Sequence, residues 1–483
     1  MAVAAIAATA IIVGAPAAGA HPRLLTADPK PSAVAPGPLQ QITVNFDEAV
    51  EWQYSSIDVE DPKGHSVKAG APRTSPRQVT IPITAEAKGP LRVTWRLVGI
   101  DAHPVIGAYV FGISAAAGAD SDTAELDQTI RQLAGTLGEG RIGSQGLNWA
   151  IRGGRALEII LLYLVVGILL LRVFVLRDVP NPVPGPGAAT AVALKPDQGY
   201  RVIRTVGIVA AIAMPGLFLL YVARLDSAVG NVDLNEVLFS SLGETWTIKT
   251  VLWVAIAGAC FYGLRRYPSV ARQHDMLLLS LAAAAAIAFG FNTHANGLSP
   301  GVMWTAMMFG HLMLTAFWAG GLVALLFLVF PSNDPQRIWP ALSRYSNVMT
   351  VTVGLVVVSG VVMLVRLLSG NIKGMWCSDF GVVAGFKMAV VAIAIVIGAI
   401  NNRVVAYQKR AMEAPVNKFR PRKERSLASL RRLIAIEAVV LGSAVLLSGA
   451  LGETQLPSVF KGHFFPVDLQ ETVRPGLFGS GCQ

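Results

Sequence analysis

The sequence of 483 residues is 53% hydrophobic and only 14% charged. Because ordinary soluble domains are about one quarter charged, this composition excludes a soluble protein for most of the chain and favours a membrane protein. The formal net charge is +10, which in a membrane protein indicates basic cytoplasmic loops and not a nucleic-acid partner. Three cysteines are too few and too scattered for a disulfide framework.

Residues 1–20 are apolar and end in Ala18-Gly19-Ala20, the A-x-A pattern that precedes a signal peptidase cleavage site. We therefore expect a signal peptide over residues 1–20, although this segment lacks the basic residues usual near its start. Cleavage would make His21 the first residue of the mature protein. Its α-amino group and imidazole would then chelate one metal ion together, at little deprotonation cost because the pKa of a free α-amine is about 8.

Residues 21–114 are predicted to form strands. Gln41–Phe46 and Leu91–Leu97 alternate polar and apolar residues and are bounded by turns that contain Pro and Gly, a pattern typical of half-buried strands. A domain of about 95 residues is large enough to bury one core without disulfides. We expect an all-β antiparallel sandwich with an immunoglobulin-like or cupredoxin-like Greek key.

Asp101 and His103 are two residues apart, so on a strand their side chains lie on the same face. Together with His21 they offer two imidazoles, an amine and a carboxylate. This donor set, in a tetragonal arrangement, suits Cu(II). Each feature alone is more often an ordinary surface group, so the prediction depends on the sequence around them.

Four segments of this region follow the pattern of one family: His21-Pro22-Arg23-Leu24-Leu25, Ile42 to Val50, Val93 to Val98, and Asp101 to Gly107 with Val110-Phe111 after it. On these segments, residues 21–114 resemble the CopC family of extracytoplasmic copper-binding proteins. The resemblance implies a Cu(II) site made by the N-terminus and side chain of His21 with Asp101 and His103, and Glu48 is a fourth candidate. Ala102 stands where the family usually has Gly, which removes no ligand. The Met-rich segment with which some members bind Cu(I) is missing.

Residues 115–150 are predicted to be a linker that contains a short amphipathic helix. Residues 151–455 then carry eight apolar segments long enough, or nearly so, to cross a hydrocarbon core about 30 Å thick, which predicts an all-α bundle of eight transmembrane helices. Residues 456–483 would form a tail. The apolar segments lie near residues 156–176, 205–223, 246–264, 276–292, 303–330, 348–368, 381–401 and 433–452.

Basic residues predict the orientation of these helices. If the mature N-terminus is outside the cell, most of them fall in loops assigned to the cytoplasm, above all in the run from Arg403 to Arg432. Short cytoplasmic loops are enriched in Lys and Arg. We therefore expect a multi-pass protein of the bacterial cytoplasmic membrane, with the N-terminal domain and the C-terminus extracytoplasmic.

Five short segments of the membrane half occur in the order typical of a second family: His294-Ala295, His311-Leu312 with Trp318 to Leu322, Arg344-Tyr345-Ser346, Phe380 to Lys387 with Asn401-Asn402-Arg403, and Leu430 to Leu433 before Glu437. On these segments, residues 151–455 resemble the CopD family of copper-resistance membrane proteins. Chains that join both modules are associated with copper uptake or copper tolerance. The resemblance implies one of these activities without deciding between them.

His294 and His311 fall in the outer half of the predicted bundle, and ionisable groups at membrane depth are expensive and usually functional. Met303, Met307 and His311 are spaced i, i+4 and i+8, so they share one helix face. Thioethers and imidazoles suit Cu(I), although Met at this spacing is also typical of core packing. We expect His294 and His311 to form a copper site of the bundle, for Cu(I) or Cu(II), with Met303 and Met307 in support.

The other ionisable residues of the membrane half are assigned structural roles. Lys249 and Lys387 are expected to snorkel to the membrane surface, and Glu437 to pair with a basic residue at the inner face. His274 is expected to be solvated in an inner loop. His65 and His463 are expected on the surface.

The predicted function is copper acquisition without enzymatic catalysis: the sandwich binds Cu(II) outside and passes copper to the bundle for import. The sequence contains neither a G-x-x-x-x-G-K-[ST] loop nor a CxxC motif, which argues against an ATP-driven pump and a P-type copper ATPase. The expected partners are the copper ion, the lipid bilayer and a cuproenzyme or copper chaperone. Two alternatives remain, a metallochaperone that supplies cuproenzymes and a membrane copper reductase, which as a dihaem protein would need four axial histidines.

Overall fold

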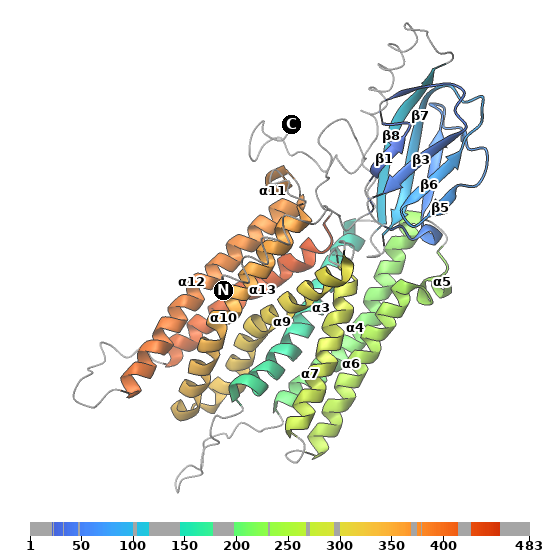
Figure 1. Ribbon diagram of the computed structural model, residues 1–483. Helices are drawn as coiled ribbons and strands as arrows, with labels where there is room; N and C mark the ends of the chain where they lie inside the picture. The colour runs from blue at the N-terminus through green and yellow to red at the C-terminus, as the bar shows by residue number, and fades with distance from the viewer. Residues whose placement is uncertain are drawn as a thin grey trace.

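The computed structural model describes a β sandwich followed by a bundle of helices (Figure 1). This confirms the fold class expected from the sequence. The described residues are 22, 24–31, 33–46, 49–99, 104–114, 145–176, 198–229, 232–266, 271–293, 300–368, 374–377, 379–413 and 427–454.

The sandwich consists of two four-stranded sheets, one in the order β1-β3-β6-β5 and the other in the order β2-β8-β7-β4. All pairings within these sheets are antiparallel except that of β2 with β8, which is parallel. The expectation of only antiparallel strands was therefore wrong at one edge, where β2 is too short to show any periodicity. The strands are β1 (Leu24–Asp28), β2 (Val34–Pro36), β3 (Gln41–Phe46), β4 (Ser56–Glu60), β5 (Arg73–Ser75), β6 (Gln78–Pro82), β7 (Gly89–Val98) and β8 (Pro104–Ser114).

The core of the sandwich follows the alternation in the sequence. Ile42, Val44 and Phe46 of β3 are buried, with more exposed residues between them. Phe46 packs edge-on against Trp95 of β7, with 5.9 Å between the ring centroids. These contacts bury the inner faces of both sheets against each other, as in other β sandwiches.

Among the described residues of the membrane half, eight helices are long and apolar enough to cross a membrane, as predicted. α3 begins at Gln145, inside the segment expected to be a linker. The helices are α3 (Gln145–Leu170, continued to Leu176), α4 (Gln198–Val229), α6 (Ser241–Arg266), α7 (Ala271–Phe291), α9 (Gly301–Ala324, continued to Ser332), α10 (Pro335–Leu367), α12 (Asp379–Glu413) and α13 (Leu427–Leu451), with the shorter helices α5 (Leu234–Leu238) and α11 (Gly374–Cys377).

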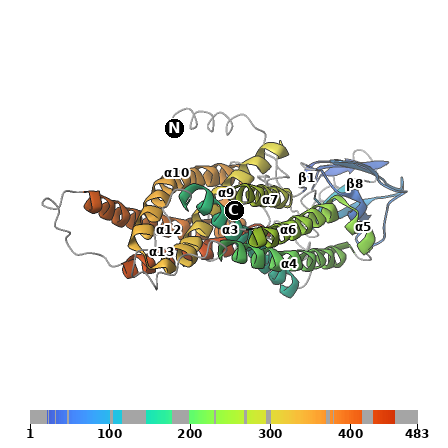
Figure 2. The ribbon, with the colours of Figure 1, turned by 90° about the horizontal axis from the view of Figure 1, so that it is seen from below.

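α3 and α9 lie in the middle of the bundle, with α4, α6 and α7 on one side and α10, α12 and α13 on the other (Figure 2). They cross where Gly167 of α3 faces Gly320 of α9. A Cβ atom at Gly320 would lie 1.9 Å from the carbonyl oxygen of Tyr163. Small residues at such a crossing let two membrane helices approach closely.

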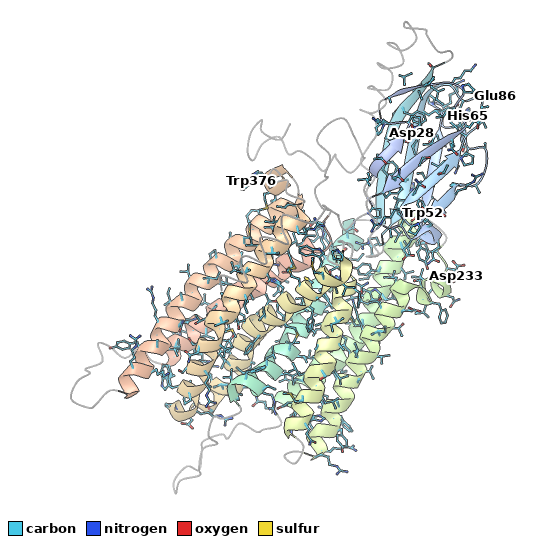
Figure 3. The ribbon with its side chains drawn as sticks, in the orientation of Figure 1. Asp28, Trp52, His65, Glu86, Asp233 and Trp376 are labelled. Atoms are coloured by element: carbon cyan, nitrogen blue, oxygen red, sulfur yellow. The ribbon has the colours of Figure 1, made fainter. Side chains whose placement is uncertain are left out.

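The sandwich lies at the end of the bundle where α9 and α12 begin and α10 and α13 end, which we call the sandwich-side end; the opposite end is the far end (Figure 1). The hydroxyl of Tyr54 donates a hydrogen bond to the carbonyl oxygen of Glu236 in α5, over 3.2 Å. Figure 3 shows Trp52 at the end of the sandwich nearest the helices. This end of the sandwich therefore rests on the connection between α4 and α6.

Candidate functional site

The four expected ligands of the sandwich, His21, Glu48, Asp101 and His103, lie outside the described residues. The strand ends on either side of them are described and lie together. Leu24 pairs with Phe46, Val98 pairs with Pro104, and Val50 bridges to Gly99. The fold thus brings the chain segments that lead into the expected ligands to one end of the sandwich, the end that also carries Trp52 and Tyr54.

His311 lines a cavity of about 410 Å³ among α3, α9, α10, α12 and α13. It lies ten residues after the start of α9, which corresponds to about 15 Å from the sandwich-side end at 1.5 Å per residue. Most of the lining is apolar. Three methionines from three helices contribute their side chains to it, namely Met308, Met363 and Met388.

The ring of His311 is oriented by α10. Its Nδ1 atom lies 2.8 Å from the hydroxyl of Ser359, and that hydroxyl also lies 2.7 Å from the carbonyl oxygen of Leu355. In the tautomer that carries hydrogen on Nδ1, Ser359 accepts from Nδ1–H and donates its own proton to the carbonyl of Leu355 or Val356. This arrangement leaves the lone pair of Nε2 available for a metal ion.

Glycine at position 360 makes room for this ring. A Cβ atom there would lie 3.3 Å from Cε1 of His311. The cavity therefore holds one oriented imidazole together with thioether side chains, and this combination of donors suits Cu(I). Lys387 also lines the cavity. That its ammonium group reaches the membrane surface stays a prediction.

Two other expected ligands of the membrane half, Met303 and Met307, lie away from the His311 cavity. They pack near Trp304 and Val362. Met308 takes the position beside His311 that the sequence had suggested for them. His294 lies outside the described residues, and within the described part of the chain no three His, Cys, Asp or Glu side chains converge as a metal site would require.

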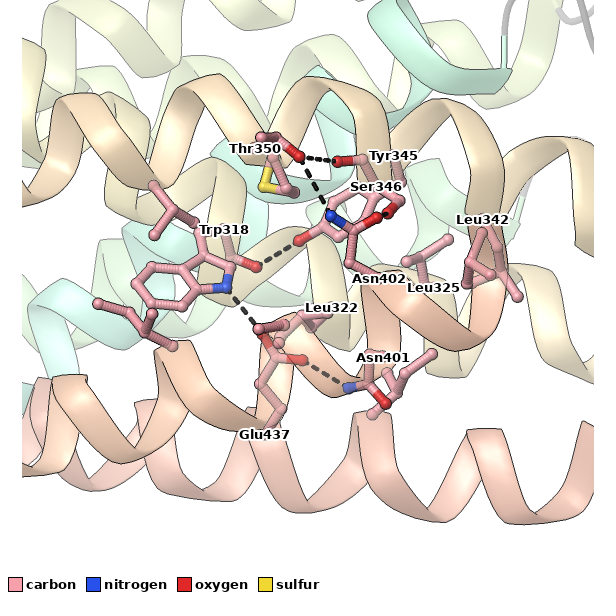
Figure 4. Close-up of a pocket in the computed structure, with 17 residues that line it drawn as sticks. Trp318, Leu322, Leu325, Leu342, Tyr345, Ser346, Thr350, Asn401, Asn402 and Glu437 are labelled. Carbon is pink, nitrogen blue, oxygen red and sulfur yellow. Dashed lines mark hydrogen bonds between the residues drawn. The ribbon is translucent and has the colours of Figure 1, made fainter. Parts of the chain in front are cut away.

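A second cavity of about 240 Å³ lies on the far side of Trp318, whose side chain lines both cavities (Figure 4). Glu437 of α13 is buried here at 3% exposure. Its carboxylate accepts a hydrogen bond from Nε1 of Trp318 over 2.9 Å and another from Nδ2 of Asn401 over 2.7 Å. The expectation that Glu437 pairs with a basic residue was wrong, because its partners among the described residues are neutral donors.

Two further expectations for ionisable residues are corrected. Lys249 does not snorkel: it is 1% exposed, lies 2.9 Å from the carboxylate of Glu158 and stacks over Trp246. His274 is not solvated, since it is 5% exposed in α7 with Nε2 2.7 Å from the carbonyl oxygen of Ala259. Both groups find their contacts on other helices, which the local sequence does not reveal. His65 is exposed, as expected.

The ion pair of Lys249 belongs to a buried cluster near the sandwich-side end. Arg155 pairs with Glu158 over 2.9 Å, and Arg224 pairs with Glu453 over 2.6 Å. Arg155 also lies 4.0 Å from Glu453. The cluster ties α3, α4 and α6 to the end of α13. Only the i, i+3 spacing of Arg155 and Glu158 hinted at it in the sequence.

Comparison with known proteins assigns both halves of the chain. Residues 24–114 match the CopC domain, and residues 339–451 match copper resistance protein D. The second match covers α10 to α13, so His311 lies before it. The chain therefore combines a CopC domain in its sandwich with a copper resistance protein D domain over α10 to α13, and this pair of domains defines a copper-handling protein of a membrane.

The chain is also similar to individual proteins. The copper transport protein CutJ of Bacillus subtilis is 22% identical over 411 residues, covering 81% of this chain and 69% of CutJ. The protein YobA of Escherichia coli is 30% identical over 102 residues, covering 20% of this chain and 82% of YobA. Among solved structures, CopC from Methylosinus trichosporium OB3b is 28% identical, with a TM-score of 0.19 over 20% of this chain and 94% of that protein.

Proposed function

We propose that this protein acquires copper: the sandwich binds Cu(II) outside the cell, and the bundle passes copper through the membrane into the cytoplasm. The observation that supports this most directly is the His311 cavity. It presents an oriented imidazole and several thioether side chains about 15 Å below the end of the bundle that faces the sandwich.

The placement of the sandwich supports a transfer from one module to the other. The strand ends that lead to His21, Asp101 and His103 lie at the end of the sandwich that rests on the helices. In this proposal the N-terminus and side chain of His21, together with Asp101 and His103, hold Cu(II), with Glu48 as a further donor. His294 and His311 then receive copper at the bundle.

Substitution of His311 tests the proposal. His311→Leu removes the imidazole but keeps the cavity apolar and filled, so we expect it to abolish copper accumulation by cells under copper limitation. His311→Met restores a soft donor and should recover part of the uptake. His65→Ala, at an exposed histidine of the sandwich, is the matched control and should behave as the parent protein.

The same measurements separate import from other roles. His294→Ala and His311→Ala should each stop accumulation while leaving the Cu(II) EPR signal of the sandwich unchanged. Normal uptake in the double Ala variant, at equal membrane expression, contradicts the proposal. A loss of cuproenzyme activity with unchanged cytoplasmic copper would instead indicate a metallochaperone that delivers copper outside the cytoplasm.

A further inference from the structure

The cavity around Glu437 contains a buried acid that the proposed copper path does not use. Glu437 lies on α13 at 3% exposure, and both of its carboxylate oxygens accept hydrogen bonds from neutral donors. Among the described residues it has no ion-pair partner. A carboxylate charge in a medium of low polarity is costly unless a positive charge offsets it. Glu437 therefore requires either a proton or a bound cation.

A second polar atom in the same cavity is also unsatisfied. Asn401 is 7% exposed and lines the cavity, and its Oδ1 atom has no hydrogen-bond partner. Buried acceptors of this kind normally have a donor or a cation beside them. Two acceptors that lack a positively charged partner, one on α12 and one on α13, therefore line the same cavity.

The polar side chains of the lining supply oxygen near these groups, and Met349 adds one thioether among the described lining residues. Asn402 donates to the hydroxyl of Thr350 over 3.3 Å and is hydrogen-bonded to Ser346. Gly398 leaves room for the carboxylate, since a Cβ atom there would lie 2.9 Å from Oε1 of Glu437. Carboxylate, amide and hydroxyl oxygens are hard donors that favour a proton or an alkali cation over Cu(I).

Few other charges face this carboxylate. From α10, Tyr345 lines the cavity, but its hydroxyl donates to the carbonyl oxygen of Trp318 over 2.6 Å. On α12 and α13 the basic residues nearest in sequence, Arg403, Arg431 and Arg432, are exposed. α3 and α9 contribute no charged side chain to the lining. The state of Glu437 is thus governed by what occupies the cavity.

Trp318 connects this cavity to the one that contains His311. Its indole ring lines both, its Nε1–H binds Glu437, and its carbonyl oxygen accepts from Tyr345 (Figure 4). Placing a proton or a cation on Glu437 weakens the acceptor that holds the indole. A change of charge in the Glu437 cavity therefore acts on Trp318, which forms part of the wall of the His311 cavity.

We propose that the Glu437 cavity is a binding site for a hard monovalent cation, a proton or Na⁺, and that its occupation is coupled through Trp318 to copper movement. The coupling rests on the proposed function, whereas the site itself does not. Asn401 suits a proton, because turning its amide by 180° offers Oδ1 instead of Nδ2 to a protonated Glu437.

Infrared difference spectroscopy of the purified full-length protein tests the site without any copper. We expect a carboxyl band that changes with pH, or with added Na⁺ at fixed pH, and that is absent in Glu437→Gln. Glu86→Gln, on the sandwich (Figure 3), is the matched control and should keep the band. A Glu437 signal that responds to neither pH nor Na⁺ overturns the proposal, whereas either response identifies which cation the site takes.

Copper flux into proteoliposomes tests the coupling. In the parent protein, an imposed gradient of pH or Na⁺ should change the initial rate at least threefold, and Glu437→Gln should remove that dependence while still binding copper at His311. The same gradient dependence in Glu437→Gln contradicts the coupling. Absence of any flux in the parent protein refutes the proposed import instead, and leaves the infrared result standing.

Discussion

At the residue scale, the chemistry of the His311 cavity depends on which ring nitrogen carries the proton. The hydroxyl of Ser359 favours the Nδ1–H tautomer, because its proton has a backbone acceptor in Leu355 or Val356 while its oxygen accepts from Nδ1–H. Partners of this type hold a metal-binding histidine in one tautomer and one orientation. The hydroxyl is therefore a positioning group that acts through the imidazole ring and does not itself contact copper.

Ser359→Ala tests this role. The substitution leaves Nδ1–H without its acceptor, so the neutral ring divides between two tautomers and the copper affinity of the purified protein should fall by about 10–100-fold. Ser443→Ala is the matched control, since the hydroxyl of Ser443 binds the carbonyl of Val439 in its own helix. Competition with a Cu(I) chelator measures both. Equal affinity in the two variants would show that Ser359 does not orient the ring.

At the element scale, the bundle is organised by the crossing of α3 and α9. Gly320→Ala should destabilise it, because the added methyl would meet the backbone of Tyr163 at 1.9 Å and the helices must separate. Overpacking of this kind costs about 1–3 kcal/mol. On the same helix, a Cβ atom at Gly310 would meet no atom within 4 Å, so Gly310→Ala is the control. Thermal unfolding in detergent should show a lower melting temperature only for Gly320→Ala.

The buried ion cluster that joins α3, α4 and α6 predicts that removing an anion destabilises the protein more than removing a cation. It contains three cations, Arg155, Arg224 and Lys249, and two anions, Glu158 and Glu453. Lys249→Met leaves two charges of each sign and keeps Arg155 beside Glu158. Glu158→Gln leaves three cations against one carboxylate, and breaking a buried pair in this way costs about 3–5 kcal/mol.

Chemical unfolding of both variants measures the difference. Glu158→Gln should lose several times more stability than Lys249→Met, although each removes one partner of the same 2.9 Å contact. Equal losses of stability would mean that Lys249 and Glu158 act as an isolated pair. The other charges of the cluster would then have no effect on this contact.

Sequence periodicity predicted the elements well and their contacts poorly. The eight spans follow from apolar length alone, and the strands from alternation, as in Gln41–Phe46. The side of α9 that faces the cavity was not predictable, because it depends on where α10 and α12 pack, and so Met308 and not Met307 lies with His311. The partners of Glu437 come from two other helices, and no local pattern encodes them.

At the scale of the whole molecule, the two modules have different donors and a fixed contact. The expected donors of the sandwich are nitrogen and oxygen, which suit Cu(II), whereas the cavity adds thioethers, which suit Cu(I). Tyr54 joins the sandwich to α5. This division predicts that the sandwich sets how much copper is captured when it is scarce, and the bundle sets whether copper crosses at all.

His103→Ala should therefore reduce accumulation strongly when copper is limiting and little when copper is abundant, whereas His311→Leu should reduce it at both concentrations.

Adding one residue before His21 should resemble His103→Ala, because the extension removes the α-amine from the site while the imidazole stays. The Cu(II) EPR spectrum should change with it, and binding should weaken as the pH falls, since protons compete for the amine and both imidazoles. If the extended protein keeps the parent affinity and spectrum, the amine is not a ligand. If His103→Ala impairs uptake equally at all copper concentrations, the sandwich is an obligatory part of the path and not a capture device.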